Sequence, residues 1–276
     1  MNSILKSILF WLLAIILATG VAIYQRMTGP TYPISGKVQL GDELVSYKLI
    51  RTWGEESDAK LVIPVKQQNV SGEFSWKRYK SHDEWESVGL ERTGEGLVTW
   101  IPRQPPAGKV MYEVSLFYGN SEYVLTQEPA IIRFKGVVPD WVTILHVIFI
   151  FLAFILSIRT GLEALAKGRY TFGYTVFTVI FLVLGGLVFG PIMQKYAFGA
   201  YWTGWPFGHD LTDNKTAVAA IFWFIALFSQ IRNRATKRWA AIASLVLLLV
   251  YLIPHSMMGS ELDHTKDAPQ TTESAE

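Results

Sequence analysis

Cysteine is absent from this chain of 276 residues. Its absence excludes disulfide bonds, thiolate metal sites, covalent attachment of a c-type haem and thiol redox chemistry. The net charge is also small, because 25 Lys and Arg against 23 Asp and Glu leave +2 at pH 7. No long basic stripe is present, so we expect no nucleic-acid partner. We find no convincing nucleophile–base pair, phosphate-binding loop or carboxylate dyad either.

Charged residues are few and unevenly placed. They make up 17% of the chain, whereas 50% of the residues are hydrophobic and the mean hydropathy is +0.26. Most charges lie between Gln25 and Lys135 and in short loops. This distribution predicts one polar domain together with a bundle of membrane helices.

Five apolar runs are candidates to cross a bilayer. The first, Ile8–Tyr24, resembles a signal peptide in having small residues near a possible cleavage point. Its length favours a retained anchor over residues 1–29. The other four predict a bundle over 139–260, followed by a polar, disordered tail at 261–276. Their expected bounds are 141–158, 170–190, about 216–231, and 239–253 with a continuation to Met258.

Residues 30–138 have a different pattern. Nine short alternating segments are separated by turn residues, which is typical of strands. Residues 117–120 predict a hairpin turn before Glu122. Strands of this spacing over about 100 residues favour an immunoglobulin-like or fibronectin-like β-sandwich, inserted between the first and second spans. Four tryptophans are expected in its core or on its faces: Trp53, Trp76, Trp85 and Trp100.

Basic residues in two loops predict the orientation. One set lies between the second and third spans: Arg159, Lys167 and Arg169. The other lies between the fourth and fifth spans: Arg232, Arg234, Lys237 and Arg238. The positive-inside rule places both loops in the cytoplasm. We therefore expect the N-terminus inside a bacterial inner membrane, with the β-sandwich, the loop at 191–215 and the tail outside the cytoplasm.

The candidate site combines this aromatic loop with two histidines. His146 and His255 lie in apolar runs, where ionisable side chains are costly and often functional. Both are expected near the outer edge, at depths of roughly 8 Å and 5 Å. Neutral imidazoles are good axial ligands of haem iron. Tyr201, Trp202 and Trp205 would then line the edge of the haem.

Simpler interpretations compete with this one. The aromatic residues could form an interfacial belt, and the histidines could bond to neighbouring helices or water. We interpret Asp213 as the N-cap of the fourth span. A copper site is a further hypothesis, although methionine in an apolar span more often serves packing. Its ligands would be His255, Met257, Met258 and His264.

The stretch from Gly199 to about His264 resembles the tryptophan-rich (WWD-type) haem-handling membrane proteins of cytochrome c assembly. The matching loop residues are Gly199, Tyr201, Trp202, Trp205 and Pro206, and the later ones are Lys215, Thr216, Trp223 and Arg232. The chain departs from that pattern because Asp210 follows the proline and FGHDLTDN is inserted before Lys215. The resemblance implies haem ligands in the flanking spans. His146 and either His255 or His264 would take that role.

The sequence thus predicts an integral membrane protein that binds or handles haem at the outer face of the inner membrane, in cytochrome assembly or electron transfer. The alternative is a non-enzymatic, membrane-anchored scaffold that acts through its β-sandwich. Either protein would sit in the lipid bilayer and would have a membrane or periplasmic protein partner.

Overall fold

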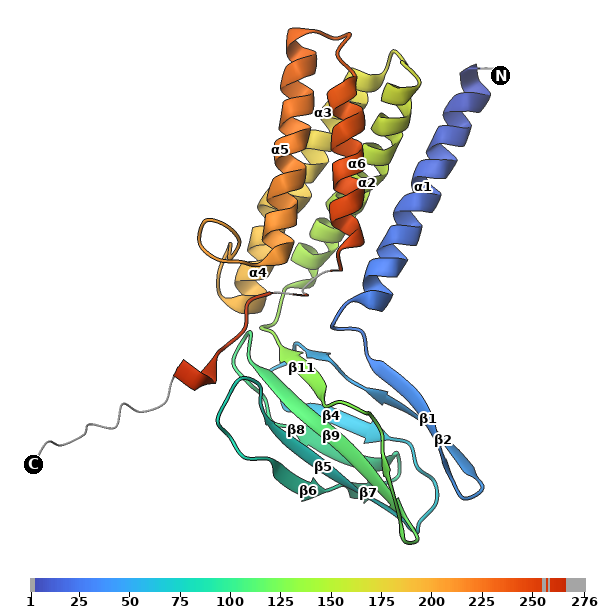
Figure 1. Cartoon of the computed structure of the whole chain (residues 1–276), viewed down its shortest axis with the longest axis vertical. Coiled ribbons are helices and arrows are strands. Elements are labelled where there is room, and N and C mark those ends of the chain that lie inside the picture. Colours follow the sequence, from blue (N-terminus) through green and yellow to red (C-terminus); the bar gives the residue numbers. More distant parts are fainter. Residues whose placement is uncertain (1–2, 255–256, 258, 267–276) are drawn as a thin grey trace, which may run out of the picture. The chain divides into compact units, whose positions relative to one another are not determined.

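The computed structural model describes residues 3–254, 257 and 259–266, which form two compact units (Figure 1). The bundle unit contains the described residues up to Pro30 together with Val138–Gly259. The β-unit contains Thr31–Val137 together with the described residues from Ser260 on. A polar β-unit and an apolar helical unit are what the uneven distribution of charge predicts.

The bundle unit is made of long apolar helices. Its elements are α1 (Ser3–Thr28), α2 (Asp140–Leu165), α3 (Thr171–Leu182), the π-helix η1 (Val183–Phe189), α4 (Gly190–Phe198), α5 (Leu211–Arg232) and α6 (Arg238–Leu252). Within the described residues, four stretches are long and apolar enough to cross a membrane: α1, α2, α3 through α4, and α5. Helix α6 has 15 residues, about 22 Å, which is shorter than the hydrocarbon core of about 30 Å. The helices support membrane association, and a fifth crossing stays a prediction.

Three helix ends differ from the expected ones. Helix α2 continues past Ile158 to Leu165, so Arg159 lies inside a helix and not in a loop. The third span continues through η1 and α4 to Phe198, where Gly199 at φ 84° ends it in the left-handed conformation. Helix α6 ends at Leu252 and Ile253 is extended, so the expected continuation to Met258 is wrong.

Small residues bring the helices of the bundle together. Gly161 of α2 faces α6 so closely that a Cβ would lie 2.3 Å from Ser244 Oγ. The fully or almost fully buried alanines on α5 and α6 are Ala219, Ala220, Ala226, Ala240 and Ala243. Close approach gives the van der Waals contact that holds apolar helices together where there is no water to exclude.

The two basic loops lie at the same end of the bundle. Lys237, before α6, donates from Nζ to the carbonyls of Lys167 and Gly168 at 2.9 and 2.7 Å. This contact agrees with the expectation that both loops lie on the same side of the membrane. That this side is the cytoplasm stays a prediction.

The β-unit is built from short β-strands, and the longest of them, Lys109–Tyr118, alternates between buried and partly buried residues along most of its length. The strands are β1 (Ile34–Leu40), β2 (Glu43–Leu49), β3 (Thr52–Trp53), β4 (Ala59–Ile63), β5 (Val70–Arg78), β6 (Glu86–Gly89), β7 (Glu91–Thr93), β8 (Gly96–Ile101), β9 (Lys109–Tyr118), β10 (Ser121–Val124) and β11 (Ala130–Phe134). One sheet has the order β3-β11-β9-β5-β6, with β10 also paired to β9. The order β4-β8-β7 forms a second sheet, and β1 pairs with β2.

The predicted strand between Glu84 and Arg92 is split at Leu90. Its first part, β6, belongs to the larger sheet, and its second part, β7, belongs to the three-stranded sheet. The Leu90 amide bonds to the Gly72 carbonyl at the crossing point. The turn at Gly119 and Asn120 joins β9 to β10 as a hairpin, as predicted. An immunoglobulin-like topology stays a prediction.

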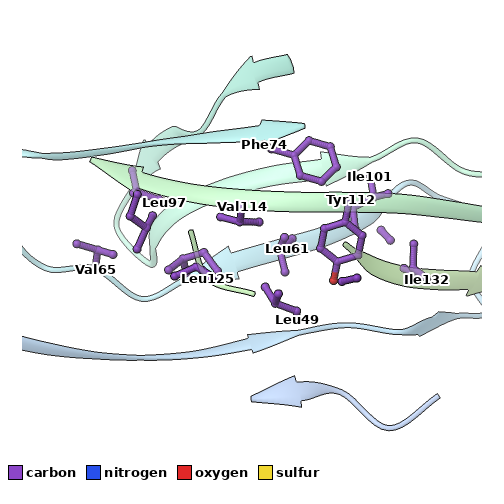
Figure 2. Close-up of a cluster of buried hydrophobic side chains, with 14 of the residues drawn as sticks. Leu49, Leu61, Val65, Phe74, Leu97, Ile101, Tyr112, Val114, Leu125 and Ile132 are labelled. Carbon is purple, nitrogen blue, oxygen red and sulfur yellow. The ribbon is translucent and has the colours of Figure 1, made fainter. Parts of the chain in front are cut away.

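Side chains from both sheets and from β2 fill one core (Figure 2). Phe74 of β5 and Tyr112 of β9 are fully buried, with ring centroids 5.7 Å apart. The Tyr112 hydroxyl donates to the Ile50 carbonyl at 2.7 Å, so the buried polar group has a partner. Trp53 and Trp76 pack against this core, whereas Trp85 and Trp100 are exposed on the surface.

Residues 261–266, expected to be disordered, belong to the β-unit together with Ser260, which was expected in the bundle. Glu261 forms ion pairs with Lys80 and Lys109, and Arg133 donates to the Ser260 carbonyl. The Leu262 amide bonds to the Ala107 carbonyl at 3.3 Å, and His264–Lys266 form a short helix, η2. The rest of the expected tail, 267–276, lies outside the described residues. The polar composition of the tail did not reveal that its first carboxylate has two lysine partners.

This attachment should depend on pH. Burial raises the pKa of Glu261, but hydrogen bonds and charges from Lys109 and Lys80 outweigh it, so the pKa lies below its usual range. A carboxylate with a depressed folded-state pKa stabilises the docked form at neutral pH, and that contribution is lost as pH falls through the depressed value. We expect the protection factor of the Leu262 amide, measured by hydrogen exchange, to fall below about pH 4.

The matched control is Glu261→Gln, which should give weak protection at every pH. Protection of Leu262 that is equal at pH 7 and pH 3 in the unmodified chain would contradict the role of this carboxylate.

Candidate functional site

His146 is half-buried on α2 and is held by one hydrogen bond. Its Nδ1 lies 3.0 Å from the carbonyl oxygen of Gly185 in η1. A carbonyl can only accept, so Nδ1 must carry the proton of this bond. In the neutral imidazole, Nε2 then keeps its lone pair. The bond therefore fixes both the orientation of the ring and the nitrogen that can bind a metal.

Glycine at position 185 makes this bond possible. A Cβ there would lie 2.7 Å from the backbone nitrogen of Ile150, so the backbones of η1 and α2 are in contact. The Gly185 carbonyl also accepts the Gly190 amide, which closes a π-turn. Isolated π-turns within α-helices often occur at functional sites. Here the π-turn and the close approach together bring the carbonyl within reach of the histidine.

The irregular loop is shorter than expected and begins at Gly199, because 190–198 form α4. Its backbone is fixed by Asp213. The Oδ2 atom of this residue accepts hydrogen bonds from the amides of Thr203 and Gly204, at 2.6 and 2.9 Å, and from Gln194 Nε2 at 3.1 Å.

The interpretation of Asp213 as an N-cap is wrong. Helix α5 begins earlier, at Leu211, and Asp210 is the N-cap, accepting the Thr212 amide at 2.8 Å.

Further contacts hold the tip of the loop against the first turn of α5. Asn214 Oδ1 accepts the Trp205 amide at 2.6 Å. The indole of Trp202 donates to the Trp205 carbonyl at 3.1 Å. A Cβ on Gly204 would lie 2.5 Å from Asp213 Cβ, so a larger residue would push the loop away from the helix. The segment 207–214 thus includes Asp213 and Asn214, whose side chains order the loop.

The ordered loop presents its aromatic rings outward. The exposed fractions are 76% for Trp205, 82% for Phe207 and 59% for Tyr201, whereas Trp202 is half-buried. Lys195 lies over the ring of Tyr201 at 5.6 Å. Exposed rings on a fixed backbone suit both an interfacial anchor and contact with a planar ligand.

A series of contacts connects His146 to the end of α6. Gly185 of η1 binds His146, and the next residue, Gly186, lies against α5. A Cβ on Gly186 would lie 2.9 Å from Thr216 Cγ2. The neighbouring Lys215 is buried and donates to the Ile253 carbonyl at 2.9 Å. His146 and Ile253 therefore belong to the same layer of the bundle. His255 follows two residues later and lies outside the described residues.

Groups of metal-binding side chains are not found in the described part of the chain. Over the described ranges 3–254, 257 and 259–266, three or more His, Cys, Asp or Glu side chains nowhere gather in a group that could hold a metal. A haem needs only one or two axial ligands, and His146 can supply one of them. Of the four expected copper ligands, Met257 is exposed and His264 belongs to the β-unit. His255 and Met258 lie outside the described residues.

A second polar site was missed by sequence reasoning. Arg159, only 1% exposed, pairs with Glu163 through Nη1 and Oε2 at 2.8 Å. Opposite charges four residues apart in an apolar helix are the signal that could have revealed the pair. It was overlooked because Arg159 was assigned to a loop on the basis of its charge.

The chain matches no protein-family model, curated protein or solved structure with which it was compared. The fold therefore defines only a class: a protein with membrane-span-capable helices and a β-unit inserted between the first helix and the rest.

Removing the carboxylate of Asp213 should release the loop. In the Asp213→Ala variant, three polar hydrogens lose their acceptor, and each unsatisfied donor costs about 1–3 kcal/mol. We expect chymotrypsin cleavage after Tyr201, Trp202 or Phe207 to be at least ten times faster, with unchanged helix content by circular dichroism. His209→Ala, at an exposed position of the same loop, is the control. Equal cleavage of the two variants would show that Asp213 does not order the loop.

Proposed function

We propose that the protein binds haem at the loop end of its bundle, with His146 as an axial ligand. The observation that carries the proposal is the bond from His146 Nδ1 to the Gly185 carbonyl. Histidines that bind metals usually donate their other ring nitrogen to a carbonyl or carboxylate, which orients the ring and makes the ligating nitrogen more basic.

The second ligand in this proposal is His255. It follows Ile253, which Lys215 links to the layer of His146. The loop would contribute Tyr201, Trp202 and Trp205 as an aromatic edge, since large planar rings pack well against a flat apolar ligand. Bound haem would supply one-electron redox chemistry, which suits electron transfer or cytochrome assembly. The location proposed is the outer face of a bacterial inner membrane, with the N-terminus inside and five crossings.

Haem content of the purified protein tests the proposal. Full-length protein from haem-replete cells should give sharp low-spin bands in a reduced-minus-oxidised spectrum, with close to one haem per chain by extraction. His146→Ala should remove most of the haem while the protein stays in the membrane. The control is His209→Ala, which removes an exposed histidine of the loop and should retain the haem.

Two outcomes would reject haem binding at His146. One is a colourless unmodified protein, and the other is normal haem content in the His146→Ala variant.

A second candidate function, an interaction scaffold, is favoured by strand β6. This strand is the edge of the larger sheet and all four of its residues are exposed. Val88 is 47% exposed, and the preceding Trp85 is 39% exposed beneath Lys77. An exposed edge strand with unpaired backbone groups can take up an extended segment of another protein. A membrane or periplasmic protein would supply that segment.

Site-specific photo-cross-linking distinguishes this candidate. A photoreactive residue at Val88 should give one discrete adduct in cells, and the same residue at Val124 on β10, also exposed, should not. The adduct should persist in the His146→Ala background, because the edge strand does not depend on the bundle site. Equal labelling from positions 88 and 124 would argue against a specific partner at β6.

A further inference from the structure

A cleft opens between α1 and α2 at the end of the bundle where the basic loops meet. Its volume is about 760 Å³. The polar side chains that line it are Lys6, Ser7, Arg159, Glu163, Arg169 and Tyr170. None of these residues belongs to the proposed haem site, which lies at the other end of α2.

The lining carries an excess of positive charge. Lys6, Arg159 and Arg169 face a single carboxylate, Glu163. That carboxylate is already engaged, because Oε2 accepts from Arg159 and Oε1 accepts the Tyr170 amide at 3.3 Å. Two positive charges are therefore not neutralised within the cleft, which favours an anionic ligand.

Arg159 lies at the floor of the cleft and has spare hydrogen-bonding capacity. Its Nη1 binds Glu163, but Nη2 has only long bonds of 3.4 and 3.5 Å to Ser7 Oγ and Tyr174 Oη. Its Nε is buried with no hydrogen-bond partner among the described residues. Nε and Nη2 form one edge of the guanidinium, and this edge can hold two oxygens of one anion.

The chain shows the use of that same edge elsewhere. In the β-unit, Arg78 binds both carboxylate oxygens of Asp83 through Nε and Nη2, at 2.7 and 2.8 Å. The interaction lowers the pKa of Asp83 to about 2. Arg159 lacks an equivalent partner for this edge within the described residues, although burial of an arginine without one is unfavourable.

The walls of the cleft indicate where the anion comes from. Ile4 and Ile8 of α1 line it beside the basic groups and are 67% and 50% exposed. The rings of Phe10, Trp11 and Tyr174 surround the Arg159 guanidinium at 5.4, 5.5 and 4.5 Å. A free phosphate would gain nothing from the apolar wall, whereas a phospholipid can place its phosphate on the basic groups and its acyl chain along the isoleucines.

We propose that this cleft binds the phosphate of an anionic phospholipid. Lys6 and Arg169 attract the headgroup at the rim, and the Nε–Nη2 edge of Arg159 receives phosphate oxygens after the long bonds to Ser7 and Tyr174 are displaced. Basic pockets between membrane helices are known to hold such headgroups. The lipid would hold α1, which has few other polar contacts with the bundle, against α2.

The test uses full-length protein in neutral detergent, titrated with short-chain phosphatidylglycerol and phosphatidylcholine and followed by native mass spectrometry. We expect phosphatidylglycerol to bind more tightly than phosphatidylcholine. The double variant Lys6→Gln/Arg169→Gln should weaken phosphatidylglycerol binding at least tenfold. The matched control, Arg232→Gln/Arg234→Gln, removes the same charge from the same end of the bundle outside this cleft and should have little effect.

Competition with glycerol 3-phosphate separates the two sources of phosphate. Weak competition supports a lipid, and competition as strong as that of phosphatidylglycerol itself would show that the ligand is a free phosphate.

An equal loss of affinity in the double variant and its control would overturn the site, because only non-specific attraction would remain. The neutral pair Arg159→Gln/Glu163→Gln leaves no buried charge unpaired and keeps Lys6 and Arg169. It should weaken phosphatidylglycerol binding while the attraction at the rim remains, and an unchanged affinity would overturn the role of Arg159.

Discussion

The contact between the backbones of α2 and η1 at Gly185 is the constraint on which the candidate site depends. With no side chain between them, the carbonyl of one helix reaches the imidazole of the other, and His146 acquires a defined tautomer. The next residue, Gly186, meets Thr216, and Lys215 beside it reaches Ile253. Helices α2, η1 and α5 and the end of α6 are thus linked through one layer by hydrogen bonds and by close contacts at glycines.

Buried polar groups give the opposite end of the bundle its own specificity. The Arg159–Glu163 pair, Thr160 with Thr178, and Thr175 with Gln230 all lie within apolar helices. Loss of one partner from a buried ion pair costs about 3–5 kcal/mol, because the remaining charge has no water to solvate it. Arg159 and Glu163 lie on one helix, whereas the bonds of Thr160 with Thr178 and of Thr175 with Gln230 join different helices. A shift in register between those helices would break these two bonds and leave buried polar groups without partners.

The β-strands were predictable because alternation along a strand is a local property. Each predicted segment from Lys37 to Phe134 corresponds to one or two observed strands. The pattern did not show two breaks, between β2 and β3 and at Leu90, where the chain passes from one sheet to another. The site was less predictable. Asp210 and Asp213 both suit an N-cap, and only the start of α5 decides between them. Arg159 has the charge of a loop residue. Glu163, four positions along the helix, is a local signal for its burial, whereas its contacts with Ser7 and Tyr174 come from distant parts of the sequence. The start of α5 and these distant contacts depend on packing across the fold, which no short sequence window contains.

The π-turn also sets the helical phase of the third span. Thr175 and Gln194 both bond to residues of α5, namely Gln230 and Asp213, yet they are 19 positions apart (194 − 175). Five turns of an uninterrupted α-helix take about 18 residues, so the extra position would rotate Gln194 about 100° away from α5. The wider turn of η1 absorbs that position. One continuous span can therefore face the same neighbour along its whole length, with the histidine's acceptor at the point where the phase is reset.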